Sequence, residues 1–185
     1  MKSQPILCLL LSGLSVVSYA ADVPAPQGTH DAAANSTDIR ALISKVGDKF
    51  NRHFVVDPRV DGRVDLDGFT PESLTYHAFL EILQSRGFAA LPSGDVTTIV
   101  PHALVRTLPT PMVSVDNIAG DDAEVVTILI PLESGDATQL ATALRPMVAV
   151  YGFLTPLPDR NALVMVDRVA NIKRIVAIIR SKNGH

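Results

Sequence analysis

The sequence contains a single cysteine, Cys8, no tryptophan, and aromatic residues that make up only 5% of its 185 positions. One cysteine excludes a disulfide scaffold and a zinc site built from several thiolates. The 16 Lys and Arg are scattered among 19 Asp and Glu, giving a net charge of −3, which argues against a duplex nucleic-acid binder. No apolar run reaches the about 18–20 residues that span a bilayer. The 47% of apolar residues is nevertheless enough for packed cores.

The N-terminal segment has the three parts of an export signal. Lys2 is positive, residues 6–17 are mostly apolar, and Ser18-Tyr19-Ala20 ends in small residues suited to cleavage between Ala20 and Ala21. We therefore expect residues 1–20 to be a signal peptide, so that the mature chain lacks Cys8. Residues 21–35 are rich in alanine, proline and polar side chains without a period, which predicts a flexible tail.

Residues 36–101 are expected to form a first sheet-plus-helix module. A helical spacing of apolar residues begins at Ser36, which with Thr37 could cap the helix. Thr70-Pro71-Glu72 has the features of a second helix start. Short strands are predicted around the Asp61-Gly62 turn and as a hairpin, in residues 54–56, 64–66, 88–91 and 96–100.

Residues 102–122 follow Pro101 and hold Pro109 and Pro111, and they are expected to form a linker, in which residues 112–115 could pair as an edge strand. Residues 123–182 predict the order strand–helix–strand–strand–helix, with the first of these helices starting at about Asp136 and Asp167 capping the last. This order is similar to a KH fold. The fold class is thus α+β, with two small sheet-plus-helix modules, the second KH-like. RNA-binding KH modules use a G-x-x-G loop, and the corresponding turn has none, so protein binding is favoured over RNA.

The residues that could carry catalysis or bind metal do not form a known pattern. The five histidines have no metal-ligand spacing, and the acidic residues 57–67 fail the register of a calcium loop. The sequence has no G-x-S-x-G elbow, P-loop or G-x-G-x-x-G. We therefore expect no cofactor, no metal and no enzymatic activity.

Several segments in a fixed order resemble the N-terminal periplasmic domains of bacterial secretins of the type II secretion (GspD) class. In the first module these are DIR at residues 38–40, FVVDPRVDGRV at 54–64, FLEIL at 79–83 and GFAA at 87–90. In the second they are VVT at 125–127, LRP at 144–146 and NALVMVDR at 161–168. The resemblance covers roughly residues 38–181. It implies stacked periplasmic rings, with the first domain contacting the inner-membrane part of the machine and none of the domains catalytic.

Two departures from the secretin pattern shape the expectations. Secretins usually have a hydrophobic strand before the first helix, whereas residues 28–36 are polar, so that strand is expected to be absent or degraded. The chain also stops at His185 without a channel domain. The sequence therefore suggests a short secretin-like protein or a truncated secretin gene product.

The favoured hypothesis is a periplasmic binding and assembly module of a type II-like secretion system. Its expected partners are an inner-membrane secretion component, a full-length secretin, or both, with a ring-like homo-oligomer and without nucleic acid or a membrane span. It would reside in the periplasm and reach the outer membrane through a secretin complex. The alternatives are a soluble regulator or decoy that binds inner-membrane components and, less favoured, a periplasmic enzyme or small-ligand protein.

Strand addition is the expected mode of partner binding, since a missing first strand leaves backbone groups unpaired at a sheet edge. The candidate residues lie on two predicted strands. They are Arg63, Val64, Asp65, Leu66 and Asp67 on one strand, and Val96 and Thr97 on the other.

Overall fold

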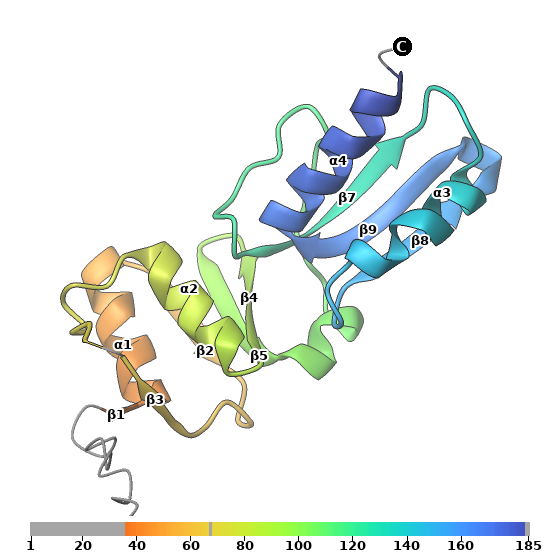
Figure 1. The fold of residues 1–185 in the computed structure, drawn as a ribbon. Helices are drawn as coiled ribbons and strands as arrows, with labels where there is room; N and C mark the ends of the chain where they lie inside the picture. The colour runs from red at the N-terminus through yellow and green to blue at the C-terminus, as the bar shows by residue number, and fades with distance from the viewer. Residues whose placement is uncertain (1–35, 67, 184–185) are drawn as a thin grey trace, which may run out of the picture. The chain divides into compact units, whose positions relative to one another are not determined.

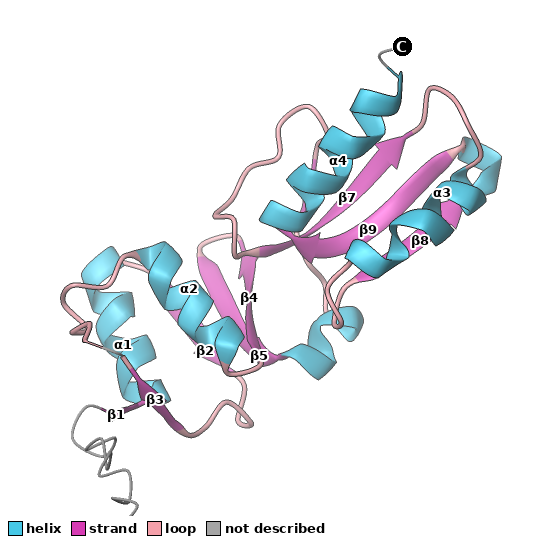
Figure 2. Cartoon of the chain, in the orientation of Figure 1, coloured by secondary structure: helices cyan, strands magenta, loops and turns pink. Residues whose placement is uncertain are grey.

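The fold is seen in a computed structural model that describes residues 36–66 and 68–183 (Figures 1 and 2). These residues belong to one compact unit, Asp31–His185. The expected signal peptide with its cleavage site at Ala20 and Ala21, the expected tail at 21–35, and Asp67 lie outside the described residues.

The first half of the described chain contains two helices and five strands. Their order is β1 (Ser36–Asp38), α1 (Ile39–Phe50), β2 (His53–Val56), β3 (Arg63–Asp65), α2 (Tyr76–Ser85), β4 (Phe88–Ser93) and β5 (Val96–Pro101). β1 pairs antiparallel with β3 in a small separate sheet. The main sheet has the order β2-β5-β4, with β2 parallel and β4 antiparallel to β5.

Two expectations about this half need correction, whereas residues 28–35, where the first strand was expected to be absent or degraded, lie outside the described residues. A short polar strand, β1, does precede the first helix, and β3 supplies its backbone partners. Asp38, not Ser36 or Thr37, caps α1 by accepting from the N–H groups of Arg40 and Ala41. Similarly, α2 begins at Tyr76 with Thr75 as its cap, and Thr70 instead forms a turn with Ser73.

Helical spacing of apolar residues builds the core of the first half. Ile39, Leu42, Ile43 and Val46 form the buried stripe of α1, and Phe79, Leu80 and Leu83 that of α2. Both stripes pack with Ile99 of β5, so the helices cover one face of the main sheet. Phe79 and Phe54 pack ring against ring, with centroids 5.6 Å apart.

The connecting segment and the second half follow the expected order of elements. The segment 102–122 contains a 3-10 helix (His102–Thr107) and the short strand β6 (Met112–Val113). Next come β7 (Val125–Pro131), α3 (Ala137–Leu144), β8 (Phe153–Leu157), β9 (Ala162–Arg168) and α4 (Val169–Asn183). The sheet order is β6-β7-β9-β8, so β6 pairs with β7 as an added edge strand. Two further 3-10 turns are Arg145–Met147 and Pro158–Arg160.

Asp167 does not cap the last helix as the sequence suggested. Its carboxylate is fully buried at the end of β9 and accepts from the N–H groups of Ala149 and Arg168 and from the Asn171 amide. A charge removed from water is tolerated only when such donors surround it. Asp167 thereby ties the loop before β8 to the start of α4.

Candidate functional site

The predicted strand around Arg63 forms one edge of the small sheet. Arg63, Val64 and Asp65 lie in β3, whereas Leu66 follows it and is buried, 4% exposed. The bond from the Ile39 N–H to the Gly62 carbonyl sets the antiparallel register, so Val64 points its backbone groups at β1. The backbone groups of Arg63 and Asp65 therefore point away from β1. On that side the Arg86 guanidinium donates to the Arg63 carbonyl oxygen.

The second predicted strand has no open edge. Val96 and Thr97 begin β5, which is hydrogen-bonded to β2 on one side and to β4 on the other. The expectation that a partner strand adds to β5 is therefore wrong. The expectation failed because β2 pairs in parallel with β5 over a long sequence separation, and the hydrophobic pattern alone does not predict such a pairing.

The main sheet instead exposes the edge of β2, which the sequence reasoning did not single out. Within the described chain, β2 is hydrogen-bonded only to β5. The bond from the Asp57 N–H to the Ile99 carbonyl shows that residues 53, 55 and 57 point their backbone groups at β5. Phe54 and Val56 accordingly point their N–H and C=O groups away from the sheet.

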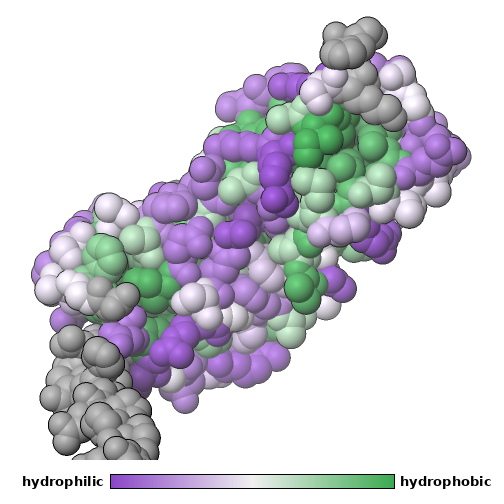
Figure 3. All heavy atoms as spheres, viewed as in Figure 1, coloured by the Kyte–Doolittle hydropathy of each residue, from purple (hydrophilic) through white to green (hydrophobic). Residues whose placement is uncertain are grey.

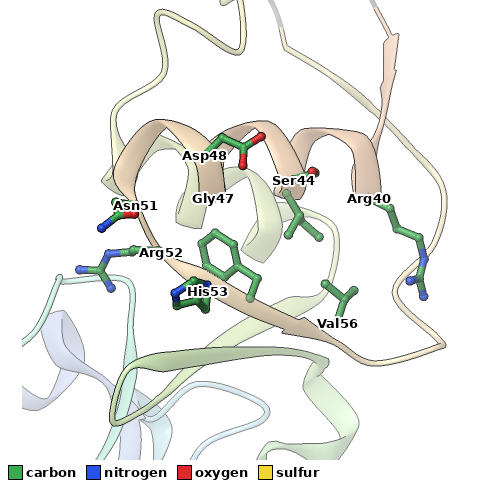
Figure 4. A pocket seen from close by; sticks show the side chains of 10 residues that line it. Arg40, Ser44, Gly47, Asp48, Asn51, Arg52, His53 and Val56 are labelled. Carbon is green, nitrogen blue, oxygen red and sulfur yellow. The ribbon is translucent and has the colours of Figure 1, made fainter.

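A groove runs between this edge and α1 (Figure 4), with a volume of about 560 Å³. Arg40, Ser44 and Asp48 line its α1 side, since they are spaced four residues apart on one face of the helix. Ile43, Phe54 and Val56 supply apolar lining. Gly47 permits the close approach of helix and strand, since a Cβ there would lie 3.0 Å from the Arg52 carbonyl oxygen and 3.3 Å from the Phe54 ring.

At the end of the groove near Arg40 and Val56, the charged side chain of the lining is that of Arg40. The Arg40 guanidinium is held by donating to the carbonyl oxygens of Asp57 and Pro58, at 3.0 and 3.1 Å. Asp57 forms a two-bond pair with Arg59, at 2.9 and 3.0 Å, which lowers the pKa of Asp57 to about 2. The Asp38 carboxylate also lies at this end, where it accepts from the Arg40 backbone N–H. Arg40 is the charged side chain there that lines the groove itself.

The opposite end has a different charge arrangement. Figure 4 shows Asp48, Asn51, Arg52 and His53 there. The Arg52 guanidinium is already engaged, stacking 4.1 Å from the Tyr76 ring centroid and lying 3.5 Å from Glu124 Oε1. Arg40 is thus the cation best placed to act on a bound molecule.

Other surfaces offer less for chemistry. A smaller groove of about 280 Å³ is lined by Ile130, Leu132, Val176 and Ile179 among others. Figure 3 shows hydrophobic side chains gathered on the half of the described chain that contains α3 and α4. Among residues 36–66 and 68–183, no three His, Cys, Asp or Glu side chains gather as metal ligands. Within the same residues, no helix is long and apolar enough to cross a membrane.

These features define a class of protein: a small α+β chain of two sheet-plus-helix halves with open strand edges. Residues 33–99 match the family described as GspD-like, N0 domain, and residues 127–181 match the bacterial type II/III secretion system short domain. The chain belongs to the type II secretion secretins, whose N-terminal domains it contains.

The similarity to individual proteins agrees with this family. The chain is 36% identical to secretin XcpQ of Pseudomonas aeruginosa over 147 residues, covering 77% of this chain and 21% of XcpQ. It is 29% identical to secretin GspD 2 of Escherichia coli O78:H11 over 174 residues, covering 90% and 25%. The Klebsiella pneumoniae type II secretion outer membrane complex of PulD, PulS and the PulC HR domain contains a similar chain, at a TM-score of 0.67 and 28% identity. That match covers 81% of this chain and 26% of the other. The chain thus spans about a quarter of the length of these relatives.

Proposed function

We propose that this chain is a periplasmic binding and assembly module of a type II-like secretion system, without catalytic chemistry. The first half would recruit an inner-membrane secretion component, and the second half would support ring-like self-association next to a full-length secretin. A relative of similar fold was determined together with PulS and the PulC HR domain. That composition supports an assembly role for the shared domains.

The observation that carries the recruiting step is the pairing of β3, which in the described residues joins no strand other than β1. Val64 pairs with Thr37 of β1, whereas the Arg63 carbonyl on the opposite side accepts from the Arg86 side chain. A strand from a partner could replace that guanidinium with a backbone ladder, which gives affinity largely independent of side-chain sequence. The charged Arg63 and Asp65 side chains flanking buried Val64 would select the partner.

Proline at position 65 tests this proposal. Asp65→Pro removes an N–H that points away from β1, so the β1–β3 bonds at Val64 remain. We expect the variant to keep its circular dichroism spectrum and to lose at least about tenfold in affinity for the inner-membrane component, measured with the purified periplasmic domain of that component. Undiminished binding by a folded Asp65→Pro variant would overturn the proposed surface.

Thr97→Pro is the matched control, since it places the same residue in the central strand. Thr97 is buried, 4% exposed, and lies between β2 and β4. We expect this variant to lose its fold. Co-purification of the full chain with a full-length secretin would separate an assembly module from a free regulator.

A further inference from the structure

The groove between α1 and β2 lies on the main sheet, so it is a different surface from the β1–β3 sheet. We infer that it binds an extended acidic segment of another protein, which adds to β2 as a fourth strand of the main sheet. The inference is independent of the partner proposed for β3.

Backbone geometry is the first support. Phe54 and Val56 direct two N–H and two C=O groups toward the groove, as the register with β5 requires. An unpaired strand edge beside open space is the arrangement that β-augmentation uses, with main-chain bonds supplying affinity. β2 is four residues long, so the added strand needs to be no longer than a short peptide.

Shape is the second support. The groove of about 560 Å³ has α1 as one wall and β2 as the other, and its lining includes apolar Ile43, Phe54 and Val56. Side chains of an added strand alternate in direction, so every second one would enter the groove and contact this lining. Ser44 is small and exposed at the middle of the α1 wall, which leaves room for them.

Charge selects the occupant. Arg40 is fixed at one end by its bonds to the Asp57 and Pro58 carbonyls, and the Asp57 carboxylate is already paired with Arg59. A carboxylate arriving at that end would meet a preorganised guanidinium, and a charge-assisted bond of this kind is stronger than a neutral one. The single acid of the wall, Asp48, lies nearer the other end. The groove therefore favours a segment with an acidic residue at the Arg40 end over a basic one.

The test uses two blocked octapeptides as probes, one alternating valine with glutamate and the other valine with lysine. Each is titrated into the isotope-labelled mature chain and followed by amide NMR. We expect the glutamate peptide to shift the Phe54 and Val56 amides and to slow their hydrogen exchange. The Val55 amide, which faces β5, should be protected with or without peptide.

Charge variants on the α1 wall sharpen the test. Ser44→Glu should lower the affinity for the glutamate peptide by about threefold or more, whereas Ser44→Lys, of similar bulk, should not lower that affinity. Arg40→Glu should lower the affinity for the glutamate peptide by about tenfold. If Arg40→Glu disturbs the turn at residues 57–58, the Ser44→Glu variant still tests the charge preference. Asp65→Pro should leave peptide binding unchanged, which separates this site from the β3 surface.

Several results would overturn the inference. These are equal or tighter binding of the lysine peptide, equal weakening by both Ser44 variants, and shifts confined to residues outside the groove. Absence of any shift at millimolar peptide would do the same. Shifts at Phe54 and Val56 that appear with protein concentration alone would assign the edge to a second copy of this chain instead.

Discussion

At the scale of single residues, Glu124 is one of two buried carboxylates of the described residues, the other being Asp167. It lies just before β7 and is 5% exposed, and its Oε1 accepts from the Tyr76 hydroxyl at 3.0 Å. Its Oε2 accepts from the Asp121 N–H at 3.1 Å. Burial and the Glu124 charge raise the pKa of Tyr76, so the phenol stays a donor. Glu124 thus joins α2 of the first half to the start of the second.

Glu124→Ala should destabilise the protein by about 2–4 kcal/mol, because it leaves the half-buried Tyr76 hydroxyl and the Asp121 N–H without their acceptor. Glu124→Gln, which keeps an acceptor oxygen, should cost less. Urea unfolding measures both. The exposed Glu133→Ala is the control and should change the free energy of unfolding by less than about 0.5 kcal/mol. A Glu124→Ala variant as stable as this control would contradict the assigned role.

His77 gives the stability a pH dependence. Its Nδ1 lies 2.8 Å from Asp121 Oδ1, and this bond, together with the nearby Glu81 and Asp122 charges, raises the pKa of His77 above its usual value. The folded state therefore prefers the charged imidazole. The resulting stabilisation is complete below the unfolded pKa of about 6.5 and is lost as the pH rises through the higher folded pKa.

We expect the urea midpoint of the protein to fall between about pH 6 and pH 8 partly through this group. His77→Gln should lower the midpoint at the acidic end and flatten the fall. Asp121→Asn should do the same, since it keeps an acceptor for the Ala123 N–H but removes the charge. A pH profile unchanged in His77→Gln would show that the contact does not contribute.

At the scale of elements, local pattern predicted which segments are helices and strands, and tertiary pairing decided how they meet. The stripe of α1, the hairpin β4–β5, and the Asp136 cap of α3 follow from spacing and local chemistry. The strands around Asp61-Gly62 were also expected, yet β2 and β3 do not pair with each other. β2 crosses to β5 and β3 returns to β1, and neither contact has a local signal.

The candidate site shows the same division. Alternation of charged and apolar residues correctly suggested that Arg63 to Asp65 form an exposed strand. The same kind of argument failed for Val96 and Thr97, since edge or centre depends on strand order. Polar Arg40, Ser44 and Asp48 at helical spacing were visible in the sequence. Their role as one wall of a groove could not be predicted, because it depends on β2 lying beside α1.

At the scale of the whole described chain, the segment 102–122 joins the two halves instead of only separating them. Val105 is 1% exposed and belongs to a cluster with Leu91 and Val100 of the first half and Val125 and Tyr151 of the second. The Arg106 guanidinium donates to the backbone oxygens of Val150, Tyr151 and Gly152. Tyr151 also receives a bond from Gln84 of α2, and burial raises its pKa to about 12.

This packing predicts where a protease can enter. Arg106 is the one tryptic site in residues 102–122, and both its neighbour Val105 and its own side chain are held. We expect native trypsin digestion to spare the bond after Arg106, because cleavage needs local unfolding of this 3-10 helix. Within the same segment, endoproteinase Asp-N should cut first near the exposed Asp116. Mass spectrometry of the early fragments measures both rates.

The Val105→Ala variant tests this expectation, because its rate of cleavage after Arg106 can be compared with that of the unaltered protein. Removing two buried methyl groups from the cluster should favour local opening, so trypsin should cut after Arg106 faster by about tenfold, while cleavage near Asp116 changes little. Met112→Ala is the matched control, because Met112 is 72% exposed and its truncation leaves the cluster intact. Rapid cutting after Arg106 in the unaltered protein, at a rate that Val105→Ala does not change, would mean that the segment is an open linker and that the two halves are not joined through it.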